Sequence, residues 1–147
     1  MDALQAMDVD TGQFVVGDRV EGFVPVGDVV VAVLAADRST LGVYRVRDLA
    51  PVRTVPIGVP VDDERLVAGG GTVAALCREA GSVVVLDTRS WQARQVDIPG
   101  KPASVAVSDD GAHVVVGTGQ GRTGRVVVVD AATESRITLK LYESDVL

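Results

Sequence analysis

The chain has 147 residues, the size of one domain, and 47% of them are hydrophobic, which excludes a disordered tail. Its 14 Lys and Arg against 20 Asp and Glu give a net charge of −6, so we expect no binding to nucleic acid, which needs a basic surface. Cys77 is the only cysteine, which excludes an internal disulfide and a cysteine-based zinc site.

The N-terminal residues have neither a basic segment nor a long apolar run, so they do not form a signal peptide. The longest apolar stretch, from Val29 to Ala36, is far too short to span a bilayer, and we expect no contact with a membrane. If Met1 is the natural start, we expect a cytoplasmic protein. If the chain is a fragment, its location is unknown.

The first predicted strand covers residues 13–20. Three similar units follow, and we assign the whole chain, 1–147, to one domain. The units cover residues 21–58, 64–98 and 103–141. In each unit a short strand leads to two apolar strands, the second ending in aspartate, and then to an alternating strand. A period near 40 residues with four strands is typical of the blades of a β-propeller.

The strand-ending aspartates define the repeat. They are Asp48, Asp87 and Asp130, spaced 39 and 43 residues apart. The two middle strands of each unit are nearly continuous valine runs, as expected for strands that pack on both faces. The outer strands alternate apolar and polar residues, as in 92–98. The sequence therefore predicts an all-β fold, a partial propeller of about three four-stranded antiparallel blades plus the N-terminal outer strand.

Two stretches resemble known propeller repeats. Pro102–Gly111, with the valine strands that follow it, resembles the YVTN-type or WD40-like bacterial repeat. Ala6–Gln13 resembles the turn motif of quinoprotein-type (PQQ-like) repeats. The positions that match this motif are Ala6, Asp8, Thr11 and Gly12, with Val16 in place of the family's usual docking tryptophan. The resemblance implies a propeller but no single function, since such propellers include enzymes, ligand binders and protein scaffolds.

The number of blades is too small for a closed ring. The strand at 13–20 belongs to a blade without inner strands, so the chain holds about three and a half blades, whereas closed propellers typically need four to eight. An open arc would expose the valine-rich faces of both terminal blades, which is an association hazard. We therefore expect a piece of a longer propeller, assembly with copies of itself, or closure with a different subunit.

Three single residues are of types that can carry chemistry or bind ligands. His113 is the only histidine, and we expect it at a half-exposed start of a strand. Cys77 ends an apolar strand, and we expect a small buried hydrophobe. Trp91 falls in a turn, and we expect it to pack against a neighbouring blade. None of them has the partners that a nucleophile or a metal ligand needs.

Two further patterns lack the features of a ligand site. The loop Gly117–Gly124 has neither the lysine nor the following helix of a phosphate loop. The acidic clusters at 62–64 and 109–110 lack the alternating ligands of a calcium loop. We therefore predict no catalytic residue, no metal and no cofactor in this chain.

Four basic residues recur at like positions in the loops at one end of the blades. They are Arg38, Arg78, Lys101 and Arg122. These loops join the second strand to the third and one blade to the next, and they form the usual binding face of a propeller. We expect an arc that contacts an acidic protein partner or an anionic ligand.

The favoured function is a non-enzymatic protein-interaction or scaffold module, a propeller subunit or portion that completes its ring with other blades. One alternative is a portion of a propeller enzyme, such as a quinoprotein dehydrogenase or a lyase, with its catalytic residues outside this chain. Another is a self-assembling ligand-binding ring. The expected partners are proteins or further blades, in a homo-oligomer or a heteromeric assembly.

Overall fold

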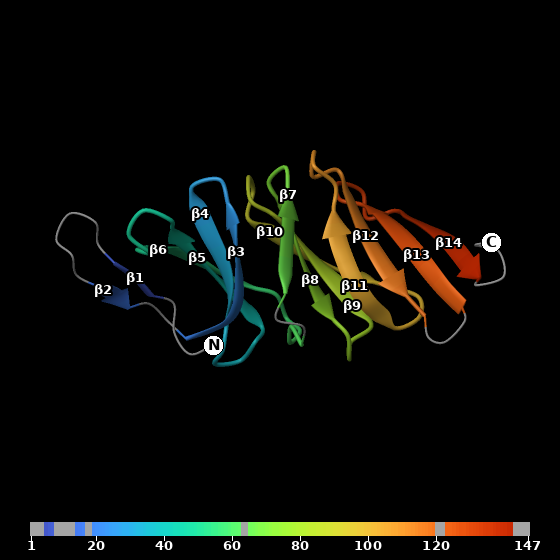
Figure 1. Cartoon of the computed structure of the whole chain (residues 1–147), viewed down its shortest axis with the longest axis horizontal. Coiled ribbons are helices and arrows are strands. Elements are labelled where there is room, and N and C mark those ends of the chain that lie inside the picture. Colours follow the sequence, from blue (N-terminus) through green and yellow to red (C-terminus); the bar gives the residue numbers. More distant parts are fainter. Residues whose placement is uncertain (1–4, 8–13, 17–18, 63–64, 120–122, 143–147) are drawn as a thin grey trace.

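The computed structural model describes residues 5–7, 14–16, 19–62, 65–119 and 123–142, and every regular element in them is a β-strand. The strands form three four-stranded sheets and one two-stranded sheet, all antiparallel. The larger sheets, which we call blades 1, 2 and 3, stand side by side along the long axis of the molecule (Figure 1). This arrangement confirms the predicted all-β partial propeller.

The strands of each blade follow one another in chain order from the inner strand to the outer one. Blade 1 contains β3 (Val20–Val26), β4 (Val29–Leu34), β5 (Thr40–Arg45) and β6 (Pro51–Pro56). Blade 2 contains β7 (Leu66–Gly69), β8 (Thr72–Cys77), β9 (Ser82–Asp87) and β10 (Gln92–Asp97). Blade 3 contains β11 (Pro102–Val107), β12 (His113–Thr118), β13 (Thr123–Asp130) and β14 (Arg136–Tyr142).

The N-terminal strand differs in extent from the prediction over 13–20. The structure places a strand, β2, at Phe14–Val16 and pairs it with β1 at Gln5–Met7. Val20, the last residue of the predicted strand, begins β3 of blade 1. Residues 8–13, which hold most of the quinoprotein-type motif, lie outside the described residues.

The middle strands of blades 1 and 2 are buried on both faces, as their valine runs predict, whereas those of blade 3 are buried on one face only. Every residue of β8 is buried, and so is every residue of β9 except Asp87. The layer between blades 1 and 2 includes Val33 and Leu86, and the layer between blades 2 and 3 includes Leu76 and Val127, all at most 1% exposed. Because burial of such a side chain contributes about 1.5–3 kcal/mol, these two layers are the main source of stability.

The turn between the third and fourth strands has the same form in all three blades. Its fifth residue adopts a left-handed backbone, with φ of 55° at Leu49, 61° at Trp91 and 63° at Glu134. The N–H of that residue donates to the carbonyl of the first residue of the turn at 2.7–2.8 Å. The first residues are Arg45, Asp87 and Asp130.

The prediction that the third strand of blade 1 ends at Asp48 is therefore wrong. β5 ends at Arg45, and Asp48 lies inside the turn. Its carboxylate accepts the Ala50 N–H at 3.0 Å and the Arg45 Nη2 at 2.7 Å, and these bonds hold the pKa of Asp48 below its usual value. Val46 extends the apolar pattern beyond the strand, although its side chain is 47% exposed, which explains the error.

Candidate functional site

The predicted basic arc belongs to the end of the blades that carries the β4–β5 and β8–β9 turns, the lower end in Figure 1. Arg38 is half-buried in the β4–β5 turn, and its Nε is buried without a hydrogen-bond partner. Arg78 donates from Nη2 to the Ala103 carbonyl of blade 3 at 3.2 Å. Lys101 is exposed between β10 and β11, and Arg122 lies outside the described residues. The arc stays a prediction, and Arg78 also joins blade 2 to blade 3.

One residue of the acidic cluster at this end, Asp62, connects two loops through hydrogen bonds. The Asp62 carboxylate accepts the backbone N–H of Arg78 at 2.6 Å and that of Glu79 at 2.7 Å. These bonds tie the link between blades 1 and 2 to the β8–β9 turn. Residues 63–64 of the same cluster and residues 120–122 of the predicted glycine loop lie outside the described part of the chain.

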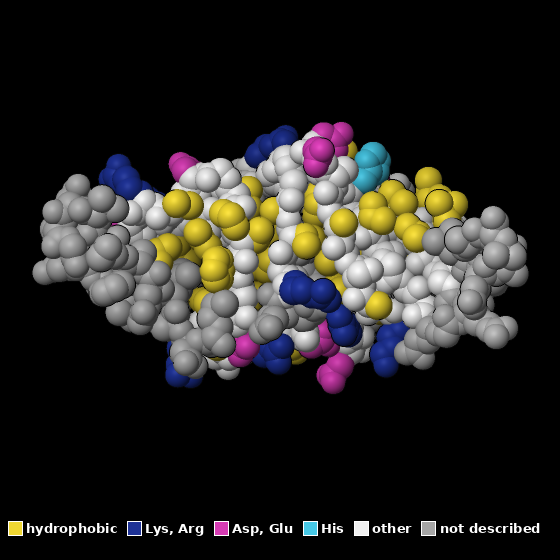
Figure 2. All heavy atoms as spheres, viewed as in Figure 1, with side chains coloured by type: hydrophobic (Ala, Val, Ile, Leu, Met, Phe, Trp, Pro, Cys, Tyr) yellow, Lys and Arg dark blue, Asp and Glu magenta, His cyan; other side chains and the backbone are white. Residues whose placement is uncertain are grey.

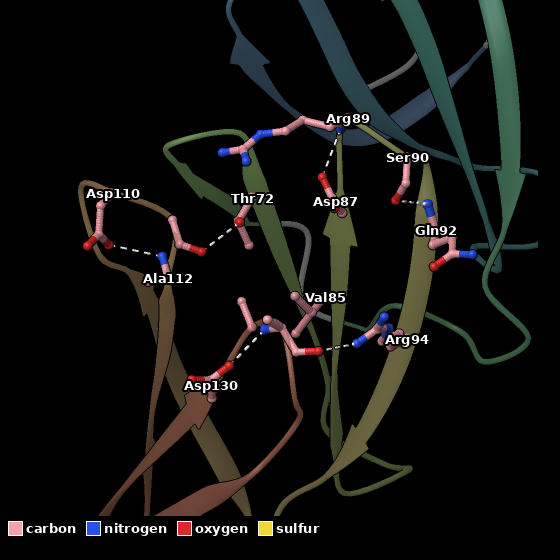
Figure 3. Close-up of a pocket in the computed structure, with 13 residues that line it drawn as sticks. Thr72, Val85, Asp87, Arg89, Ser90, Gln92, Arg94, Asp110, Ala112 and Asp130 are labelled. Carbon is pink, nitrogen blue, oxygen red and sulfur yellow. Dashed lines mark hydrogen bonds between the residues drawn. The ribbon is translucent and has the colours of Figure 1, made fainter.

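A cavity of about 410 Å³ lies between blades 2 and 3 at the opposite end (Figure 3). Two of its hydrogen bonds cross from blade 2 to blade 3. Thr72 Oγ1 donates to the Gly111 carbonyl at 2.8 Å, and Arg94 Nη1 donates to the Ala132 carbonyl at 2.7 Å. Three carboxylates stand around the cavity, those of Asp87, Asp110 and Asp130.

Each of these three carboxylates accepts a hydrogen bond from the backbone of its own turn. Each accepts the backbone N–H of the residue two positions later, at 2.8–2.9 Å, as Figure 3 shows. Such backbone bonds are the main reason why the pKa values of Asp110 and Asp130 are lowered. The polar groups of the cavity therefore serve the turns and the joint between the blades.

Cys77 takes the buried position predicted for it, and His113 begins a strand as predicted but is exposed rather than half-exposed. Cys77 has no exposed surface, and burial, with a smaller effect of the Asp62 charge, raises the pKa of its thiol to about 11. His113 begins β12 in an exposed position. Within the described ranges, no group of three or more His, Cys, Asp or Glu residues could hold a metal ion. No helix in those ranges is long and apolar enough to cross a membrane.

Blade 3 packs against blade 2 through one face only. In β12 alternate residues are buried, whereas every residue of β8, its counterpart in blade 2, is buried. We call the other side the open face of blade 3. Its apolar side chains are Ala106, Val115, Val126, Val128, Ile137 and Leu139. Ile137 is 66% exposed and Leu139 is 54% exposed. Figure 2 shows hydrophobic side chains gathered over this blade, around β12 and β13.

The open face corresponds to a face that is buried in blade 2. By strand register, Val128 takes the place of Val85. Leu139 takes the place of Val96. Val85 and Val96 are 5% and 3% exposed and belong to the layer between blades 2 and 3. The open face thus has the composition of an interblade layer, and none of the residues that the structure describes forms a blade against it.

One position of the fourth strand distinguishes the open face of blade 3 from the corresponding buried faces of blades 1 and 2. Blade 1 has Arg53 there, whose guanidinium carbon lies 5.0 Å from the centre of the Trp91 ring in blade 2. This contact confirms that Trp91 packs against a neighbouring blade. Blade 2 has Arg94, which reaches the Ala132 carbonyl of blade 3. Blade 3 has Ile137 at this position.

The prediction of two exposed terminal faces is wrong for blade 1. Ala32 is 0% exposed and Tyr44 is 2% exposed on the face that points away from blade 2. The apolar side chains on this side of the sheet form a cluster that is separate from the layer between blades 1 and 2. Its buried members are Val20, Val30, Ala32, Tyr44 and Leu49. The sheet of β1 and β2 lies beyond this face of blade 1 (Figure 1).

No residue of the open face was among the predicted site residues. A signal was present in the sequence, since Val126–Val129 is a continuous valine run and Ile137 and Leu139 alternate with polar residues in the next strand. A continuous run is typical of a strand that packs on both faces. The structure adds that only one of these faces has a neighbour within the described residues.

Solved structures similar to this chain are propeller proteins of varied function. A chain of the mitotic checkpoint complex is 17% identical with a TM-score of 0.65, over 94% of this chain and 44% of that one. Hydrazine synthase of Kuenenia stuttgartiensis is 17% identical with a TM-score of 0.61, over 79% and 33%. The Cps50 (Swd1) β-propeller domain of Myceliophteria thermophila is 11% identical with a TM-score of 0.59, over 84% and 39%.

These likenesses show the fold alone. The chain spans between a third and less than half of the length of each of these relatives. No family model matches the chain, and no curated protein matches it. The propeller fold with WD40-like blades is thus shown, whereas the YVTN-type and quinoprotein-type assignments stay predictions.

Proposed function

We propose that this chain is a non-enzymatic protein-interaction module that receives a further β-sheet on the open face of blade 3. The observation that carries the proposal is the one-sided burial of an apolar blade. The β13 strand has valine at four successive positions, and only Val127 and Val129 are buried among them.

The physical reason lies in the cost of leaving such a face in water. Each aliphatic side chain of this size is stabilised by about 1.5–3 kcal/mol when it is buried completely. Ile137, Leu139 and the partly exposed Val126 and Val128 together offer several such gains. Contiguous apolar patches of this kind mark interaction surfaces on soluble proteins.

The shape of the face favours a flat partner. Blade 2 already packs a sheet on blade 3, and it uses the same kind of aliphatic side chains in a layer between two sheets. A sheet that is contributed by another protein or by further blades can repeat that packing, because sheet faces interdigitate at about 10 Å. The propeller relatives, which are longer than this chain, are consistent with additional blades at this position.

The substitution Ile137→Asp tests this proposal. We expect the natural chain, isolated from its source under native conditions, to sediment in a complex larger than its own 15.3 kDa. Ile137→Asp places a charge on the open face, at the side chain that is most exposed there, where burial without a partner is strongly unfavourable. The complex should therefore be lost, as measured by sedimentation velocity and native mass spectrometry.

Val52→Asp provides the matched control. Val52 lies in β6 of blade 1, away from the open face, and is 46% exposed, so an aspartate there should leave the complex intact. The proposal is contradicted if the natural chain sediments at 15.3 kDa. It is also contradicted if Ile137→Asp and Val52→Asp preserve the complex equally.

A further inference from the structure

We infer that the sheet on the open face of blade 3 is the open face of a second copy of this chain, so that two chains meet like to like. The inference rests on the proposed function, because it names the partner of the same surface. Three observations support it, and they concern blade 1, the position of Ile137 and the placement of charge.

The first observation excludes the ordinary way of joining two arcs. A head-to-tail ring would place blade 3 of one copy on the outer face of blade 1 of the next. On that face Ala32 and Tyr44 are already buried, at most 2% exposed. A second copy can therefore not contact those two side chains without a rearrangement of blade 1, whereas the open face of blade 3 has no neighbour among the described residues.

The second observation is that blade 3 lacks the arginine that blades 1 and 2 have in their fourth strands. Arg53 and Arg94 occupy the same position in blades 1 and 2, and each reaches across to the turn of the next blade. A two-fold contact between identical faces would place two such arginines in one apolar layer. Blade 3 has Ile137 instead, so this position carries no charge to oppose association of two copies.

The third observation is where the polar groups of the face lie. His113 and Asp130 are paired in the register at one end of the open face, and the described positions between them and the far end are apolar or small. A two-fold axis that runs from β11 to β14 turns the second copy over. The His113 and Asp130 end of each chain then lies far from that of its partner.

This axis also preserves the curvature of the arc. It brings β11 of one copy beside β11 of the other, and β14 beside β14, so the inner strands stay on the inside. Two sets of three blades then follow one another in a single arc. Interfaces of homodimers are more apolar than other protein surfaces, in agreement with the composition of the open face.

The substitution Ile137→Arg separates a second copy from an ordinary blade. It restores the residue type that blades 1 and 2 carry and that is compatible with their interblade packing. In a like-to-like dimer it places two arginines, one from each copy, in a single apolar layer without partners. We expect the purified natural chain to sediment at twice 15.3 kDa and Ile137→Arg to weaken the dimer on the order of 100-fold or more.

Val52→Arg is the control, since it adds the same charge to an exposed valine of blade 1, and it should leave the dimer unchanged. Thermal unfolding followed by circular dichroism checks that Ile137→Arg folds. The inference is overturned if the purified natural chain is a monomer at all concentrations, or if Ile137→Arg dimerises as the natural chain does. The proposed function fails separately, when Ile137→Asp leaves the complex from the source unchanged.

Discussion

Gly70→Ala is expected to lower the free energy of unfolding by about 3–5 kcal/mol and to loosen the joint between blades 2 and 3. Gly70 has a φ of 53°, in the left-handed region that side chains rarely adopt. A Cβ there would also overlap the backbone carbonyl of Asp110, in the β11–β12 turn of blade 3. Because both obstacles are backbone, neither can be relieved by a change of rotamer. Urea or guanidinium unfolding followed by circular dichroism measures the loss.

Gly27→Ala is the matched control for the close approach. Gly27 has a φ of 59°, nearly the same as Gly70, but a Cβ there would meet nothing within 4 Å. It should cost about 1–2 kcal/mol through backbone strain alone. Equal losses for the two substitutions would show that the turns of blades 2 and 3 do not touch as described.

Leu86→Ala is expected to lower the free energy of unfolding by about 3–5 kcal/mol. Leu86 is 0% exposed and packs in the layer between blades 1 and 2, with residues of both blades around it. Removal of its side-chain carbons leaves a cavity that the surrounding strands, fixed by their hydrogen bonds, cannot fill completely. The same denaturant titration measures the effect.

Val52→Ala serves as the control for this core substitution. Val52 is 46% exposed in β6, so its truncation should change the free energy of unfolding by less than about 0.5 kcal/mol. If Leu86→Ala has an equally small effect, the two blades do not share the apolar layer that the structure shows.

The blades could be predicted because their strands carry a redundant pattern. The valine runs of β8 and β9 have side chains that are buried on both faces, and the fold places them as the pattern requires. The end of β5 could not be predicted, because exposed Val46 continues the apolar pattern into the turn. There the turn geometry, with a left-handed Leu49, decides where the strand ends.

The surface that we propose as an interface depends on packing, which the sequence does not contain. Val126 and Val127 are neighbours of the same type in one strand, yet only Val127 is buried, because only its side of the sheet faces blade 2. The sequence likewise does not show which of the two terminal faces is buried. In the structure Tyr44 on the outer side of blade 1 is buried, whereas Ile137 and Leu139 on the outer side of blade 3 are exposed.

For the basic arc, the sequence predicted the position of a side chain but not its contact. Arg78 was predicted from its position in a loop at the binding end of the blades. The structure adds a hydrogen bond from its guanidinium to the Ala103 carbonyl of blade 3, a contact between residues far apart in the chain. Loop charge and loop position could be read from the sequence, whereas the partner of the side chain depends on the arrangement of the blades.

The most direct test of the central claim, that protein covers the open face of blade 3, is the rate of alkylation of a thiol introduced by Leu139→Cys. The natural Cys77 does not interfere at pH 8, because it is fully buried and its pKa is raised to about 11. Val52→Cys is the reference, since Leu139 and Val52 are 54% and 46% exposed in the single chain. In the assembled protein we predict that the thiol of Leu139→Cys reacts many times more slowly than that of Val52→Cys. Equal rates for the two thiols in the assembled protein would contradict the claim.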